Sequence, residues 1–158
     1  MSQLIPDGIY TIDAGNMSQP GAGLAQFAPT ENPEPGSRLV VQHPDEAGQG
    51  STTWEVKYDE AQGAYTLRNP HSGHYCGYEG ELASTNMQLN SSTEPAYWNL
   101  VTAEGENTGN NTFHIHAKGT DVLLGQSPLM IYPPIAALQA IDSPFAAGMK
   151  MSWKFNPA

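Results

Sequence analysis

The chain has 158 residues, about the size of one ordinary domain, and we interpret residues 1–158 as a single domain. Only 14% of the residues are charged, and the 16 Gly and 13 Pro residues disfavour a helical protein because both interrupt helix interiors. The formal net charge of −10 disfavours nucleic acid and anionic membranes as partners, since both carry negative charge.

The N-terminal segment Met1–Asp7 lacks the basic stretch and the apolar run of a secretory signal. No stretch approaches the roughly 18 consecutive apolar residues that suggest a membrane helix. Cys76 is the single cysteine, so an internal disulfide is excluded. We therefore expect a cytoplasmic protein, or one exported by an unconventional route.

Short segments that alternate apolar and polar residues follow one another along the chain, as half-buried strands do. No segment predicts a convincing amphipathic helix; the apolar run Ile135–Ile141 lies between Pro134 and Pro144, inside a predicted long insertion at Pro133–Gly148. In chain order the predicted strands are Gly8–Ile12, Leu24–Ala28, Leu39–Gln42, Trp54–Val56, Gly63–Leu67, His74–Tyr78, Asn86–Asn90, Trp98–Leu100, Asn111–Ile115, Asp121–Gly125, Leu129–Tyr132 and Trp153–Phe155.

Two sets of these segments are internal repeats. GIYTI at Gly8–Ile12 recurs as GAYTL at Gly63–Leu67 and, more weakly, as NTFHI at Asn111–Ile115. A second set begins with Trp54, Trp98 and Trp153, and each of the first two tryptophan segments precedes an aromatic segment. The third ends the chain, so its partner is the first segment, and the C-terminal strand should pair with the N-terminal strand.

Twelve strands in three units of roughly 50 residues predict an all-β fold, the β-trefoil. In a β-trefoil, six strands form a barrel and three hairpins cap one end of it. Barrel closure also removes exposed sheet edges. A β-sandwich is the alternative fold, but it gives no reason for the threefold spacing of the tryptophans.

The residues that could carry chemistry form no recognisable catalytic or metal site. The alternation around the histidines predicts solvent-facing strand positions, and Cys76 is expected to be a packing residue; these candidates are His71, His74, Cys76, His114 and His116. Carboxylate pairs such as Asp45-Glu46 and Asp59-Glu60 fall in turns, with nothing to separate an acid from a base. We predict no enzyme activity, no cofactor and no metal.

Carbohydrate binding is a common use of the β-trefoil, and a trefoil lectin or defence protein is therefore an alternative function. Ricin-type lectins carry a Q-x-W element in their repeats. Here the residues two positions before the tryptophans are Thr52, Ala96 and Met151. The tryptophans are thus expected to fill the barrel core, and a lectin of another trefoil type stays open.

The chain resembles the mycocypins of mushrooms over nearly its whole length. The opening Asp7–Tyr10 resembles the family's D-G-x-Y, and Pro20–Gly23 resembles its P-G-x-G loop. Trp54–Val56 followed by Gly63–Leu67, and the ending Ser152–Phe155, are similar to further family segments. Mycocypins are β-trefoil inhibitors of papain-like cysteine proteases, and the resemblance implies that fold and that function here, with such proteases as partners and a monomeric inhibitor.

In that family two loops form a wedge that covers the protease's catalytic cysteine reversibly. The resemblance places the first loop at Pro20–Leu24, with Gly23 matching the glycine that approaches the protease most closely. The second loop, Pro44–Gly50, lacks the family's apolar tip. The predicted protease-binding residues are Pro20, Gly21, Ala22, Gly23, Leu24, Asp45, Glu46, Ala47 and Gly48.

Two other protease classes remain as alternatives. Some mycocypins inhibit asparaginyl endopeptidase through a further loop, which here matches Asn69, Pro70 and His71. A proline directly after the asparagine should obstruct substrate-like docking across that bond. Inhibition of a trypsin-like serine protease would require a basic residue at a loop tip, and Lys118, before Gly119, is the candidate.

Overall fold

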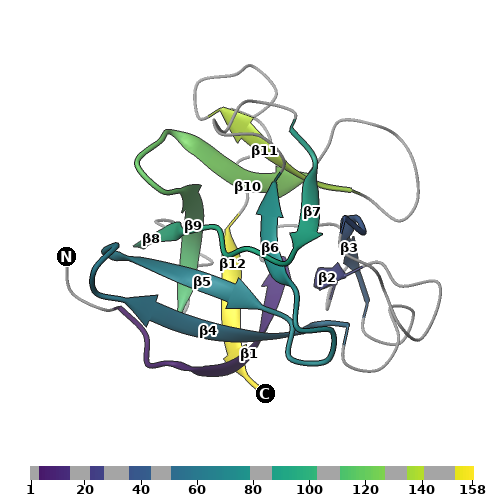
Figure 1. The fold of residues 1–158 in the computed structure, drawn as a ribbon, viewed down its shortest axis with the longest axis horizontal. Coiled ribbons are helices and arrows are strands. Elements are labelled where there is room, and N and C mark those ends of the chain that lie inside the picture. The colour runs from purple at the N-terminus through teal and green to yellow at the C-terminus, as the bar shows by residue number, and fades with distance from the viewer. Residues whose placement is uncertain are drawn as a thin grey trace.

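The computed structural model describes residues 4–14, 22–26, 36–43, 51–78, 87–102, 111–126, 135–140 and 152–158, with the side chains of residues 14, 126 and 140 excepted. Over these ranges no helix is long and apolar enough to cross a membrane. The described chain forms twelve β-strands (Figure 1): β1 (Gly8–Ala14), β2 (Gly23–Gln26), β3 (Leu39–Gln42), β4 (Thr53–Asp59), β5 (Ala64–Arg68), β6 (Tyr75–Tyr78), β7 (Leu89–Ser92), β8 (Trp98–Thr102), β9 (Thr112–Ala117), β10 (Val122–Gln126), β11 (Ala136–Ala140) and β12 (Trp153–Pro157).

Six of the strands close into a ring. Antiparallel pairing runs from β1 to β4, β5, β8, β9, β12 and back to β1. The predicted pairing of the terminal strands is confirmed, since β12 lies beside β1 with Ile12 opposite Phe155 (Figure 1). Within each repeat unit, where the first strand pairs with the fourth, an aromatic residue of one repeat set stands opposite a tryptophan of the other: Tyr10 with Trp54, Tyr65 with Trp98, and Phe113 with Trp153.

The other six strands form three hairpins, β2–β3, β6–β7 and β10–β11. Each hairpin is joined to the barrel through its first strand, which pairs with β1, β5 or β9. The hairpins also contact one another, because single β-bridges join Arg38 to Asn90, Val40 to Ile135 and Gln88 to Ala137. This arrangement is the predicted β-trefoil.

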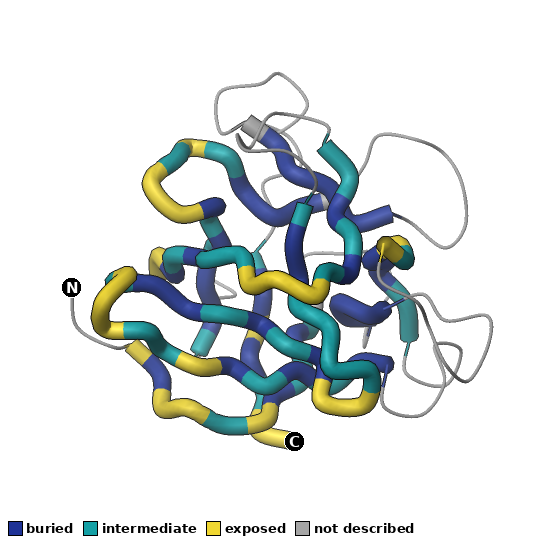
Figure 2. Tube along the Cα trace, viewed as in Figure 1, coloured by how far each residue is buried: buried dark blue, intermediate teal, exposed yellow. Residues whose placement is uncertain are grey.

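The tryptophans lie in the core, as the sequence predicted. All three have 0% of their surface exposed. Each indole Nε1 donates a hydrogen bond to a carbonyl oxygen in the second strand of its own unit: Trp54 to Leu24 at 2.9 Å, Trp98 to Cys76 at 3.2 Å and Trp153 to Leu124 at 3.0 Å. A buried indole N–H needs such a partner, so the same bond is made three times. Figure 2 shows where the buried residues lie along the chain.

The eleventh strand differs from its prediction. It is β11, Ala136–Ala140, which lies within the predicted insertion Pro133–Gly148, whereas the predicted strand Leu129–Tyr132 lies outside the described residues. Alanine is a poor strand former, and residues 135–139 are all buried, so no alternation marks the strand. Five residue pairs with β10 hold it in place.

Candidate functional site

The predicted inhibitory loops leave the fold from neighbouring strands. Gly23, at the start of β2, stands opposite Asp13 of β1 on one side and Gln42 of β3 on the other. Adjacent strands lie about 4.8 Å apart. The connection 15–21 joins β1 to β2, and the connection 44–50 begins after β3. Since β2 lies between β1 and β3, the two connections are attached at three neighbouring strands. Six predicted contact residues fall in these connections and lie outside the described residues: Pro20, Gly21, Asp45, Glu46, Ala47 and Gly48.

The other three predicted residues of the first loop lie inside the fold. Ala22 and Leu24 are fully buried in the hydrophobic core, and Leu24 also accepts the indole hydrogen bond of Trp54. A Cβ at Gly23 would stand only 2.8 Å from the carbonyl oxygen of Ile12. The expectation of an exposed loop through Leu24 is thus corrected, because β2 begins at Gly23 and packs against β1.

Asp13 lies where the first connection begins. Its Oδ2 accepts a hydrogen bond from Asn156 Nδ2 at 2.6 Å. Partial burial raises the pKa of the Asp13 carboxyl, although hydrogen bonds from Asn156 and Thr11 and the charge of Lys154 act in the opposite direction. The end of β1, where the first connection begins, therefore holds the Asp13 carboxyl group in a partly buried, incompletely solvated position.

The return of the second connection is anchored by a polar network under the β5–β6 hairpin. The carbonyl oxygen of Ser51 accepts hydrogen bonds from Gln26 N at 3.1 Å and from Asn69 Nδ2 at 3.4 Å. The Gln26 side chain, 2% exposed, accepts from Ser72 Oγ at 2.6 Å and contacts His74 Nδ1 through Nε2 at 3.1 Å. The sequence did not predict a role for Gln26, because a glutamine in a strand is typical of a solvent-facing position.

Asn69, the candidate for docking to asparaginyl endopeptidase, is 1% exposed. Its Oδ1 accepts hydrogen bonds from the backbone N–H groups of His71 at 2.9 Å and Ser72 at 3.0 Å, which forms an Asx turn. The exposed residues of this hairpin are Pro70 and His71. Presenting the Asn69 amide to a protease pocket would therefore require the turn to open.

Lys118, the candidate for a trypsin-like protease, is exposed in the turn between β9 and β10. Its Nζ donates to Gln62 Oε1 at 2.6 Å and lies 6.0 Å from the centre of the Tyr97 ring. The turn is tight, since Thr120 N bonds to the Ala117 carbonyl oxygen at 3.0 Å and Gly119 has a φ of 72°. The lysine is thus held along the surface of a compact turn.

The cysteine and histidines predicted to be inert form no cluster in the structure. Cys76 is fully buried, and burial strongly raises the pKa of its thiol, which disfavours the nucleophilic thiolate. Within the described residues no group of three histidine, cysteine, aspartate or glutamate side chains could hold a metal ion.

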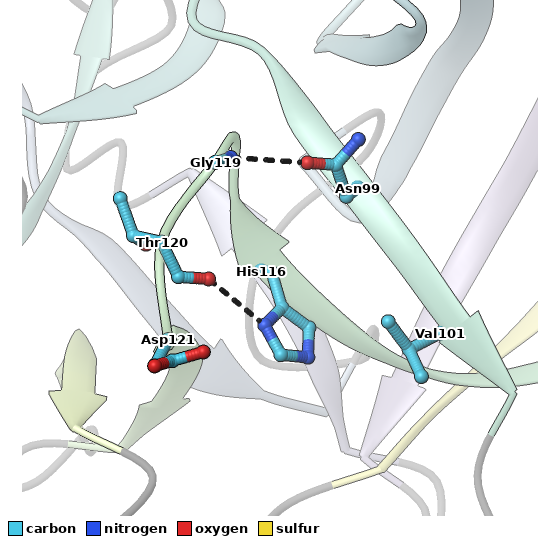
Figure 3. Close-up of a pocket in the computed structure, with 6 residues that line it drawn as sticks. All are labelled: Asn99, Val101, His116, Gly119, Thr120 and Asp121. Carbon is cyan, nitrogen blue, oxygen red and sulfur yellow. Dashed lines mark hydrogen bonds between the residues drawn. The ribbon is translucent and has the colours of Figure 1, made fainter. Parts of the chain in front are cut away.

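One open hollow, with a volume of about 270 Å³, lies beside the turn between β9 and β10 (Figure 3). The sequence did not predict this hollow, because its residues come from β8, β9 and the following turn and meet only through strand pairing. The residues that line it are Asn99, Val101, His116, Gly119, Thr120 and Asp121.

Comparison with known proteins supports the fold. No protein-family model and no curated protein matches the chain. The Rhizoctonia solani agglutinin is similar over 100% of both chains, with a TM-score of 0.76 and 18% identity. The designed threefold symmetric protein ThreeFoil is similar over 96% of this chain and 100% of its own, with a TM-score of 0.69 and 16% identity.

A proteinase inhibitor from Coprinopsis cinerea is also similar, over 98% of this chain and 99% of its own, with a TM-score of 0.67 and 15% identity. The β-trefoil proteins of fungi that share this fold therefore include both an agglutinin and a proteinase inhibitor. At these identities the likeness shows the fold alone.

Proposed function

We propose that this protein is a reversible inhibitor of papain-like cysteine proteases, which inserts its β1–β2 and β3–β4 connections into the active-site cleft. The observation that carries the proposal is the position of Gly23, paired with Asp13 on one side and Gln42 on the other. The first connection ends at β2 and the second begins at the adjacent β3, so the two can enter one cleft together. The resemblance to the mycocypins and the inhibitor from Coprinopsis cinerea with the same fold add support.

The proposed contact residues of the first connection are those that precede Ala22 in the sequence. Ala22 and Leu24 have no exposed surface to offer, so the contacts fall to residues 15–21, with Pro20 and Gly21 the leading candidates. Proline restricts the backbone before binding, and glycine lets a backbone approach a narrow cleft without a Cβ. Both features lower the entropic or steric penalty of inserting a loop.

The anchoring of the second connection fits the same mechanism. Ser51, where the described chain resumes, is tied to Gln26 of β2 and to Asn69 of the β5–β6 hairpin. Two loops held on one rigid scaffold bind as a unit, because docking of the first raises the effective concentration of the second. Inhibition by covering the cleft requires no cleavable bond and no exposed Asn69 or Lys118.

Titration of papain with the full chain tests the proposal. We expect inhibition at micromolar concentration or below, and we expect Gly21→Glu to weaken it roughly tenfold, since a charged side chain in a tight contact adds steric and desolvation penalties. Ala61→Glu is the matched control, because Ala61 is exposed in the β4–β5 turn. Its inhibition constant should equal that of the parent chain.

Parallel assays against asparaginyl endopeptidase and trypsin separate this mechanism from the alternatives. The geometry of Asn69 and Lys118 leads us to expect no inhibition of either enzyme. Absence of papain inhibition at micromolar chain, or equal inhibition by Gly21→Glu, would overturn the proposal. Binding of glycans by exposed tryptophan platforms forms no part of it, since the three tryptophans are buried.

A further inference from the structure

The hollow beside the β9–β10 turn combines fixed polar groups with one exposed apolar side chain. We propose that it binds a single uncharged saccharide ring through its hydroxyl groups. The site is separate from the two connections proposed to inhibit proteases, and this inference does not rest on that function. Its volume of about 270 Å³ lies below the roughly 300–1,000 Å³ of pockets for drug-sized ligands, which suits one ring rather than a larger molecule.

One side of the hollow is held in place by Asn99. Its Oδ1 accepts a hydrogen bond from Gly119 N at 3.2 Å, and its Nδ2 donates to the Gly63 carbonyl oxygen at 3.1 Å. Because an amide nitrogen carries two hydrogens, Nδ2 can donate a second hydrogen bond to a ligand oxygen. The orientation of the amide is therefore determined before any ligand arrives.

His116 presents an acceptor. Its Nδ1 lies 3.2 Å from the Thr120 carbonyl oxygen, and a carbonyl can only accept, so Nδ1 carries the proton of this bond. In the neutral ring Nε2 is then the acceptor. Figure 3 shows the imidazole between Asp121 on one side and Val101 on the other.

Asp121 and Val101 supply the two remaining features. Asp121 is exposed, and its carboxylate makes no hydrogen bond or ion pair with the part of the chain that the structure describes. A carboxylate can accept hydrogen bonds from two neighbouring hydroxyls. Val101, 46% exposed, offers an apolar surface for the C–H face of a sugar ring.

This combination of groups selects among ligand classes. Two acceptors and one donor match hydroxyl groups, which both donate and accept hydrogen bonds. The carboxylate of Asp121 disfavours anionic ligands, and the neighbouring Lys118 ammonium is directed to Gln62. A cation could satisfy Asp121 and His116, but it would leave the Asn99 donor and the Val101 surface unused.

The experiment is a titration of the isotope-labelled full chain with four neutral sugars, galactose, N-acetylgalactosamine, glucose and mannose, followed by amide chemical shifts. We expect at least one sugar to give saturable millimolar binding, with shifts at Val101, Gly119 and Asp121. Asp121→Asn should weaken this binding roughly tenfold, because hydrogen bonds to a charged acceptor become neutral ones. Glu94→Gln, at an exposed carboxylate outside the hollow, should leave it unchanged.

Three results would overturn the inference. The first is the absence of saturable shifts with all four sugars, and the second is a set of shifts confined to other residues. The third is equal affinity in Asp121→Asn and the parent chain. A parallel titration with N-acetyl-lysine methylamide, a cationic probe, should give no comparable shifts; saturation of the hollow by this probe alone would assign it to a cation instead.

Discussion

Gly23 lies against the backbone of Ile12, so closely that a Cβ at position 23 would stand 2.8 Å from the Ile12 carbonyl oxygen and 3.2 Å from Asp13 Oδ1. The glycine is therefore required by the packing of β2 on β1. A charged substitution at this position would disturb the scaffold as well as any loop contact. Variants that test the first connection must accordingly lie before Ala22.

Gly23→Ala is expected to lower the free energy of unfolding by about 1–3 kcal/mol, because backbone atoms of β1 must shift to admit the methyl group. Gly8→Ala is the matched control, since the nearest atom to its Cβ would be 3.5 Å away, an ordinary contact. Urea unfolding of both variants measures the difference. Equal stability of the two would contradict the packing role assigned to Gly23.

Replacement of any one tryptophan by phenylalanine should destabilise the protein by a similar amount. Trp54→Phe, Trp98→Phe and Trp153→Phe each leave one buried carbonyl oxygen without its donor, which costs about 1–3 kcal/mol before any loss of packing. Thermal or urea unfolding of the three variants measures the effect. A variant as stable as the parent chain would show that its hydrogen bond contributes nothing.

The Cys76 thiol should be unreactive in the folded protein. Burial raises its pKa, so the thiolate that reacts with disulfide reagents is scarcely populated, and the sulfur is inaccessible. We expect labelling at mildly alkaline pH to follow the fraction unfolded as urea is increased. Rapid stoichiometric labelling of the native chain would contradict the burial of this side chain.

Asp13 should make stability depend on pH. Its folded-state pKa is raised above the ordinary value of about 4, so the folded chain retains the proton to higher pH than the unfolded chain. This carboxyl's contribution is fully present below the unfolded pKa and is lost as pH rises through the folded pKa. As pH rises through the mildly acidic range, the free energy of unfolding of Asp13→Asn, measured with urea, should decline less than that of the parent chain. Parallel pH profiles of the two proteins would contradict the raised pKa of Asp13.

Gln26→Met should destabilise the support of the second connection by about 1–3 kcal/mol. The substitution removes the polar partners of Ser72 Oγ and His74 Nδ1 within a part-buried network. Gln62→Met is the control, because Gln62 is exposed and its side chain bonds to exposed Lys118. Urea unfolding compares the two, and a neutral effect of Gln26→Met would show that the network adds no stability.

Repetition made the architecture predictable from the sequence. The aromatic and tryptophan segments recur in the same order. Equivalent strands of the three repeat units therefore make equivalent pairings. Tyr10, Tyr65 and Phe113 stand opposite Trp54, Trp98 and Trp153 because equivalent positions meet equivalent neighbours. The strand β11 was not predicted, because the continuous apolar segment Ile135–Leu138 carries no alternation that distinguishes a strand from a connection.

The candidate sites were less predictable than the fold. A P-G-x-G pattern indicates a loop, but it does not indicate where the loop ends and the buried strand begins. Asn69 could be an exposed recognition residue or an Asx-turn residue, and the hydrogen bonds to His71, Ser72 and Ser51 were needed to decide. The hollow around His116 combines strands whose side chains become neighbours only through pairing.

The sequence by itself thus determined the all-β class, the threefold repeat, the pairing of the terminal strands and the burial of the tryptophans, because periodicity and repetition are carried by the chain itself. Only the tertiary structure decided that Gly23 and Leu24 are internal, that Asn69 is engaged in its own turn, and that Asn99, His116 and Asp121 surround one hollow. Exposure and convergence depend on residues distant in sequence, such as Ile12, Ser51 and Gly63, whose approach no local pattern records.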